Sequence, residues 1–270
     1  MTTEVPVPKP TIYLRNHFVI KPNAIPQFLY GKENLIRNTV PCWHLMAACA
    51  ERPVWKNTQD AEPSLSALQV WRLDDWNTLY KTIYRFSDSG WYNALGSTLA
   101  SEHQDLLVGV LGGDTVPRAP HWADDNIAGY CYLYEAALPH HGRTQQYLRG
   151  LNWFTALARK AMQWQRVWTG LQVTAAPSEI AVLWKVPGNT GAIEDGLRAI
   201  ITPGATAERY QVMMGSLKTL SRKALYPMFS ERIAQLVHEN PRRSIPQIIP
   251  RPDPLFAPST ILPCPIPSMY

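Results

Sequence analysis

Apolar and polar residues alternate in several short segments of the chain, as expected for strands with one buried face. The first such segment, Thr11 to Ile20, is also rich in β-branched and aromatic residues, and the turn-like Lys21-Pro22-Asn23 follows it. Strands are predicted by the same criteria at 11–20, 43–50, 67–73, 105–111, 129–138, 168–174 and 179–186, with an irregular one at 225–229 because Pro227 interrupts it.

Other segments carry apolar residues at helical spacing. Helices are predicted at 25–40, 74–86, 91–101, 143–165 and within 192–224. In both halves of the chain the order is therefore β-α-β-β-α-β, which is the split βαβ arrangement of ferredoxin-like folds.

Three pairs of matching segments, in the same order, indicate a tandem repeat. Tyr13 to Pro22 parallels Tyr130 to Pro139, the segment around Trp71 parallels that around Trp184, and Leu95-Gly96-Ser97 parallels Met214-Gly215-Ser216. We expect a first unit at 8–113, a second unit at 126–239, and a Pro-rich tail at 240–270 that runs extended over the body.

Composition narrows the function classes. The net charge is +5, but the Lys and Arg residues are scattered, so a nucleic-acid partner is not expected. The four cysteines form no C-x-x-C pair, and no segment has the pattern of a signal peptide or a membrane span, which predicts a cytoplasmic protein without a membrane partner. Nucleotide-binding loops and the G-x-S-x-G elbow of hydrolases are absent from the sequence, and no metal-ligand spacing is evident.

The first hundred residues carry motifs of a known family. The segments Tyr13 to Pro22, Leu68 to Asp75 and Ser89 to Leu95 resemble the opening strand, the H-L-W-R-Y-D-D strand and the closing segment of NIPSNAP-like proteins. These motifs also resemble the wider dimeric α+β barrel superfamily, which includes haem-degrading and quinone-forming monooxygenases, isomerases and polyketide cyclases. The resemblance implies an intramolecular pseudo-dimer of two ferredoxin-like units, with a ligand cavity between a unit's sheet and its helices.

The resemblance also bears on cofactors. Trp71 and Asn16 match positions that approach the porphyrin in haem-degrading relatives, but the iron-binding histidine would fall near Ala94 or Leu95, which cannot ligate iron. We therefore predict an enzyme that works without a cofactor.

Strand alternation sorts the candidate site residues by face. The resemblance places Asn16, Gln69 and Trp71 on the helix-facing side, where two amides and an indole suit a flat, oxygenated, hydrophobic ligand. Packing in the core is the alternative role for Trp71. The second unit aligns Leu133, Val182 and Trp184 with these three residues, so we expect the working site in the first unit and a structural role for the second.

Arg15 and His17 share the opposite face and should meet Tyr132 and Tyr134 between the units. A hydrogen-bonded structural cluster and a catalytic pair, with His17 as base and Arg15 as oxyanion stabiliser, are both open. Glu135 lies on an otherwise apolar strand and is a candidate acid or base, with a strand-end salt bridge as the alternative. His44 and Tyr134 complete the predicted substrate-binding residues.

The predicted function is that of a cofactor-independent enzyme in secondary or catabolic metabolism. It would act on a small aromatic, quinone-like or terpenoid molecule by monooxygenation or by proton-transfer isomerisation or cyclisation, and further homo-oligomers could form. A non-catalytic ligand-binding or stress-related scaffold is the alternative.

Overall fold

A computed structural model describes residues 11–29, 43–51, 65–73, 76–77, 96–111, 129–173, 178–202 and 204–228. The predicted helix beyond residue 29, most of the predicted helices at 74–101, the linker and the tail at 240–270 lie outside these residues. So do the proposed unit boundaries, which stay predictions, and Ala94 and Leu95.

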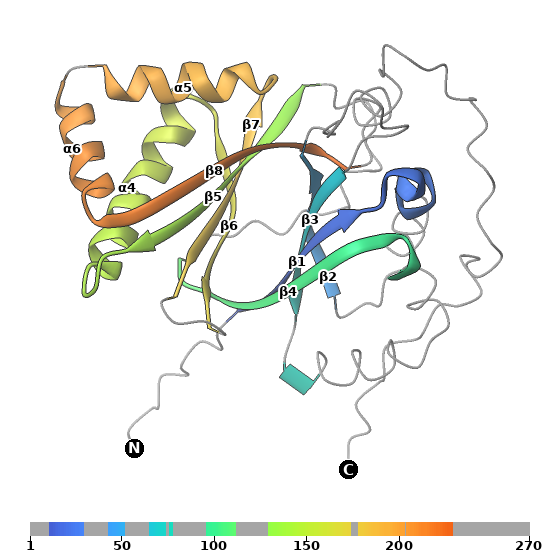
Figure 1. Ribbon diagram of the computed structural model, residues 1–270. Coiled ribbons are helices and arrows are strands. Elements are labelled where there is room, and N and C mark those ends of the chain that lie inside the picture. The colour runs from blue at the N-terminus through green and yellow to red at the C-terminus, as the bar shows by residue number, and fades with distance from the viewer. Residues whose placement is uncertain are drawn as a thin grey trace, which may run out of the picture.

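The strands in the described residues close into one barrel, in the order β1-β3-β2-β8-β5-β7-β6-β4 (Figure 1). Every pair of neighbouring strands is antiparallel. The strands are β1 (Ile12–Ile20), β2 (Trp43–Ala50), β3 (Leu65–Leu73), β4 (Leu99–Gly109), β5 (Tyr130–Pro139), β6 (Gln165–Gln172), β7 (Ile180–Pro187) and β8 (Leu217–Pro227).

Each half of the chain contributes four adjacent strands in the same order. β4-β1-β3-β2 form the first half-sheet, and β8-β5-β7-β6 form the second. The half-sheets join through short ladders: β2 pairs with β8 at Cys49–Pro227 and Ala50–Tyr226, and β4 pairs with β6 over Leu107–Gly109. This arrangement is the mixed α+β barrel that the resemblance implied. A tandem repeat would produce it, although duplication itself remains a prediction.

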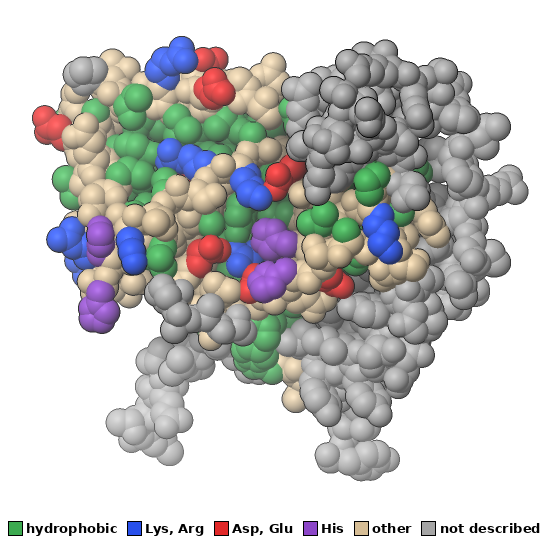
Figure 2. Space-filling view, viewed as in Figure 1, with side chains coloured by type: hydrophobic (Ala, Val, Ile, Leu, Met, Phe, Trp, Pro, Cys, Tyr) green, Lys and Arg blue, Asp and Glu red, His purple; other side chains and the backbone are tan. Residues whose placement is uncertain are grey.

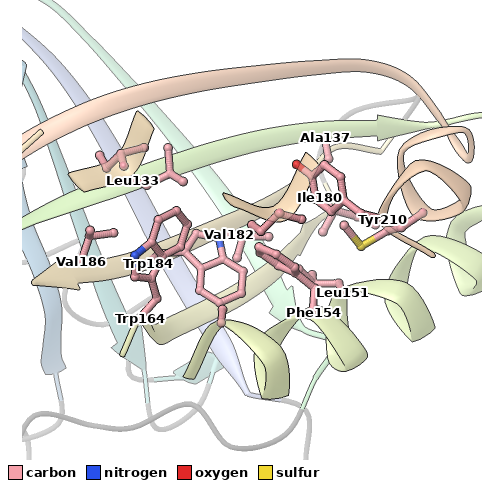
Figure 3. Close-up of a cluster of buried hydrophobic side chains, with 14 of the residues drawn as sticks. Leu133, Ala137, Leu151, Phe154, Trp164, Ile180, Val182, Trp184, Val186 and Tyr210 are labelled. Carbon is pink, nitrogen blue, oxygen red and sulfur yellow. The ribbon is translucent and has the colours of Figure 1, made fainter. Parts of the chain in front are cut away.

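Helices α4 (Thr144–Ala161), α5 (Gly191–Ile201) and α6 (Ala205–Met214) cover the outer face of the second half-sheet (Figure 1). Their buried side chains pack on alternate residues of β5 and β7, because successive residues of a strand point to opposite faces. The resulting core is centred on Trp184, which has Phe154 of α4 and Trp164 beside it (Figure 3). A short 3-10 turn, Pro22–Ala24, follows β1.

A second core fills the barrel interior. Tyr13, Leu68, Tyr132, Trp168 and Leu183 are buried there, with the rings of Tyr13 and Trp168 at 5.9 Å between centroids. Both halves contribute to this cluster. The barrel interior is therefore the interface between the two half-sheets.

The predicted boundaries of β8, β4, β6 and α4 differ from the structure by three or more residues, and β6 runs from Gln165 to Gln172 where 168–174 was predicted. β8 begins at Leu217, so the predicted helix over 217–224 is wrong and so is the predicted strand start at 225. β4 begins at Leu99, six residues before the predicted start at Asp105, and its first half is mostly exposed and polar. α4 ends at Ala161 because Gln163 has a φ of 58°, in the left-handed region that a helix cannot continue through.

Candidate functional site

Two amide side chains lie next to each other on the outer face of the first half-sheet. Asn16 of β1 and Gln69 of β3 are directly opposite one another in the antiparallel ladder, and their exposed fractions are 6% and 0%. Alternation along β1 places Asn16 between Leu14 and Phe18, both buried on the same face. The two amides are thus set in an apolar surface.

The oxygen atoms of these two amides have no hydrogen-bond partner among the described residues. Asn16 Oδ1 and Gln69 Oε1 are both fully buried, while Gln69 Nε2 donates a weak, 4.0 Å contact to Met228 Sδ. A buried acceptor without a donor costs about 1–3 kcal/mol. Two adjacent acceptors of this kind need a physical explanation, and Trp168 Nε1 and Thr169 Oγ1 of β6 are likewise buried without a hydrogen-bond partner among the described residues.

Trp71 is on the same face as the amides. It lies two residues from Gln69 on β3, opposite Leu14 of β1, and is 3% exposed. Trp71 packs with Ile12, Leu14 and Leu73 in one apolar cluster, and Phe18 packs with Phe28 in another. The structure therefore brings together Asn16, Gln69 and Trp71, as the sequence predicted.

The equivalent face of the second half-sheet has different chemistry. Trp184 lies opposite Leu133, as Trp71 lies opposite Leu14, and Val182 lies opposite Glu135, as Gln69 lies opposite Asn16. The counterpart of Asn16 is therefore Glu135, and the predicted counterpart, Leu133, is wrong. The sequence alignment was out of step by two residues, so it kept the correct face and misidentified the residue.

Glu135 is fully paired where Asn16 is not. Its carboxylate accepts a hydrogen bond from Trp184 Nε1 at 2.8 Å and one from Arg222 Nε at 2.8 Å. Arg222 also donates to the Tyr210 hydroxyl of α6. Burial raises the pKa of Tyr210, which keeps this phenol protonated near neutral pH. Glu135 thus has the salt bridge that was its alternative role, beneath the helices of the second half.

Arg15 lies inside the barrel and joins the two halves. Its guanidinium donates to Asp105 Oδ2 of β4 at 2.7 and 3.1 Å, to Glu179 Oε1 at 2.6 Å, and to the Tyr134 hydroxyl of β5. Gln172 Nε2 donates to the other oxygen of Asp105 at 2.6 Å. Burial alone would lower the pKa of Arg15, but Tyr134, Glu179 and Asp105 together raise it above its ordinary value.

The carboxyl and imidazole groups around Arg15 are shifted as well. Burial favours the protonated form of Asp105, yet hydrogen bonds and charge from Arg15 outweigh it and lower the pKa of this carboxyl. Burial, followed by the charge of Arg15, lowers the pKa of His17 to about 4. His17 is therefore neutral at pH 7, with its ring edge-on to Tyr134 at 6.0 Å.

The eight predicted site residues fall in separate places. Asn16, Gln69 and Trp71 form the first-half face, whereas Arg15, His17 and Tyr134 meet in the barrel interior. Glu135 belongs to the second-half face. His44 lies opposite Arg72 in the ladder between β2 and β3, on the side of the sheet opposite Trp71. The structure thus separates the predicted catalytic residues from the predicted substrate-binding amides, and their roles remain predictions.

Sequence reasoning missed the partners of these residues. Asp105, Glu179 and Arg222 were not singled out, although each bonds to a predicted site residue, and neither was Tyr210, which bonds to Arg222. Strand pairing could have revealed Arg222, which lies opposite Glu135 in the ladder between β5 and β8. That signal was lost because the segment containing Arg222 was predicted to be helical.

Within the described residues, no group of three or more His, Cys, Asp or Glu side chains is placed to bind a metal ion. The same part of the chain contains no helix that is both long and apolar enough to cross a membrane.

No protein-family model matches the sequence, and no curated protein matches it. Solved structures do match the fold. A candidate monooxygenase from Lactobacillus acidophilus aligns at a TM-score of 0.52 and 8% identity, over 80% of this chain and 93% of that one. An anthrone oxidase-like protein aligns at 0.54 and 10% identity, over 80% and 90%.

A candidate monooxygenase from Fusobacterium nucleatum aligns at a TM-score of 0.52 and 8% identity, over 81% of this chain and 93% of that one. At such low identities these likenesses establish the fold alone: a mixed α+β barrel of the dimeric α+β barrel type. They do not single out NIPSNAP-like proteins, so that finer resemblance is unconfirmed.

Proposed function

We propose that the chain is a cofactor-independent, monooxygenase-type enzyme that binds a small, flat, hydroxylated aromatic molecule on the outer face of the first half-sheet. The observation that carries this proposal is the adjacent pair of buried, unpartnered acceptors, Asn16 Oδ1 and Gln69 Oε1. A ligand hydroxyl group supplies a donor to one of these acceptors, and Trp71 supplies an aromatic surface beside them.

The chemistry of the face favours a substrate that is already prone to oxidation. The described side chains around the amides, namely Leu14, Phe18, Phe28, Trp71 and Met228, include no acid or base. Catalysis would then come from orientation in a dry, apolar setting. An amide acceptor would also polarise the O–H bond of the substrate, which shifts electron density onto the oxygen and the ring. Two of the structural neighbours, which share only the fold, are described as candidate monooxygenases and one as anthrone oxidase-like.

Anthrone is a suitable probe, because its enol form carries a hydroxyl on a flat, electron-rich ring system. In the reaction proposed, the CH2 group becomes a carbonyl: one atom of dioxygen enters the product, and the other leaves as water with the two hydrogens of that carbon. Turnover is measured as oxygen uptake and anthraquinone formation. Binding is measured in the absence of oxygen as quenching of tryptophan fluorescence.

At least one of Asn16→Leu and Gln69→Leu should weaken anaerobic binding about tenfold, which corresponds to the loss of the probe's one hydrogen bond, of about 1.4 kcal/mol. Asn152→Leu is the matched control, because it makes the same change at an exposed amide on α4. Unchanged binding in both site variants would refute the proposed site. Binding without oxygen uptake above the uncatalysed rate would instead support the ligand-binding scaffold.

A further inference from the structure

The outer side of β8 is only partly covered by the helices of the second half. Leu220, Arg222 and Ala224 point to the helix-facing side, since they lie opposite Ala137, Glu135 and Leu133 of β5. Leu220 is half-buried, while Ala224 is exposed and the Arg222 side chain is 32% exposed. Figure 2 shows hydrophobic side chains gathered in the region bounded by α5, α6 and β8, with basic side chains among them.

Arg222 is held in place from two sides. Its Nε donates to Glu135, which is 5% exposed, and its Nη2 donates to the Tyr210 hydroxyl of α6. Burial tends to lower the pKa of Arg222, but the charge of Glu135 and the phenol of Tyr210 raise it overall, so the guanidinium stays charged. A guanidinium fixed in this way loses little side-chain entropy when it binds an anion.

Arg222 has hydrogen-bonding capacity to spare. A guanidinium carries five N–H donors, and the two hydrogen bonds above use two of them. Neither of these bonds involves Nη1, and the side chain is partly exposed. The remaining donors suit the two oxygens of a carboxylate.

Apolar side chains lie on the same side of the second half-sheet as Arg222, and Leu220 is two residues from it on the same face of β8. Leu197 of α5 and Leu217 and Leu220 of β8 are partly buried and pack against the cluster that contains Trp184. They would contact the apolar body of a ligand whose charged end reaches Arg222. This combination of one cation and an aliphatic border selects a molecule with a single anionic end.

We infer that the second half contains its own binding site, for a small hydrophobic carboxylate anchored by Arg222. This site is separate from the one under Proposed function: it lies on the other half-sheet, and it offers donors where the first half offers acceptors. The second half is then more than a structural partner of the first.

Isothermal titration calorimetry with 2-naphthoate and its uncharged analogue 2-naphthamide tests the inference on the intact protein. We expect 2-naphthoate to bind at least tenfold more tightly, and the preference to persist in an Asn16→Leu/Gln69→Leu double variant. Equal affinity for the two compounds would overturn the inference without touching the first-half proposal, and so would loss of the preference in the double variant.

Two variants localise the effect. Ala224→Glu places a carboxylate on the same face of β8, two residues from Arg222, and should weaken 2-naphthoate binding at least fivefold. Ser221→Glu is its matched control, because it makes the same charge change at an exposed position on the opposite face. Equal losses in the two variants would indicate nonspecific repulsion and overturn the inference. Arg222→Lys, where it folds, should remove most of the preference for the carboxylate.

Discussion

The outer faces of the two half-sheets share a backbone arrangement and differ in how their polar groups are paired. Each has a buried tryptophan at the same register, Trp71 in the first half and Trp184 in the second. Beside Trp184, the carboxylate of Glu135 has two donors. On the face that carries Trp71, the oxygens of Asn16 and Gln69 have none among the described residues.

This difference separates groups that stabilise the fold from groups available to a ligand. A paired carboxylate contributes to the folded state, whereas unpaired buried acceptors cost stability and need another reason to be present. In the barrel interior Arg15 belongs to the first kind, while the buried Nε1 of Trp168 has no hydrogen-bond partner among the described residues. There Arg15 and Tyr134, 119 residues apart and at equivalent positions of β1 and β5, meet through a hydrogen bond.

The largest effect is expected where the halves meet. Arg15→Leu leaves the carboxylate of Asp105, which is 3% exposed, without its cation, and should lower the free energy of unfolding by about 3–5 kcal/mol. Urea denaturation followed by circular dichroism measures the change. Arg198→Leu on the exposed side of α5 is the control and should change stability by less than about 0.5 kcal/mol. If Arg15→Leu and Arg198→Leu both changed the stability by the same small amount, the ionic cluster around Arg15 would not stabilise the contact between the two half-sheets.

The second-half pair should show a smaller loss with a clear coupling. Glu135→Leu removes the acceptor for both Trp184 and Arg222 and should cost about 2–4 kcal/mol. Adding Arg222→Leu should recover part of that loss, since no unpaired charge then remains. The double-mutant cycle from urea denaturation gives the coupling energy. Strict additivity of the two losses would contradict the pairing.

Apolar patterning predicted the buried strands well. β1, β2, β5 and β7 lie within two residues of their predicted bounds, because short, mostly apolar segments mark strands that are covered on both faces. β4 is exposed in its first half, and β8 is exposed along most of its length. Their polar residues carry no alternation, and Leu217, Leu220 and Ala224 even fall at helical spacing, so pairing with β5 overrides the local signal.

Face assignments could be predicted and partners could not. Alternation along β1 placed Asn16 and Arg15 on opposite sides of the strand, as observed. An error of two residues in aligning the halves also leaves every side chain on its correct face. The same error exchanged Leu133 for Glu135. The bonds from Arg222 to Glu135 and from Arg15 to Glu179 depend on strand pairing across most of the chain, which local sequence does not encode.

A stability gain is expected in the first half, in contrast to the losses above. Asn16→Leu replaces an acceptor that lacks a donor with an apolar side chain of similar size, and should raise the free energy of unfolding by about 1 kcal/mol without ligand. The same variant should bind anthrone less tightly. Urea denaturation with and without the probe measures both effects. A loss of stability comparable to that of Glu135→Leu would remove the distinction between the two faces.

The last prediction concerns pH and separates the interior cluster from both outer faces. The pKa of His17 is lowered from 6.5 in the unfolded chain to about 4 in the folded protein. Between these values the unfolded state binds more protons, by up to about one, so stability should fall as the pH decreases from 6.5 toward 4. Asp105, whose pKa is lowered from 3.8, loses its contribution only below that range. His17→Gln should therefore flatten the pH dependence of the urea midpoint between pH 6.5 and 4, while His140→Gln, an exposed control, should leave it unchanged. If the urea midpoint of His17→Gln still fell over this pH range, other groups would account for the proton uptake. His17 would then not be the residue that titrates in the barrel interior.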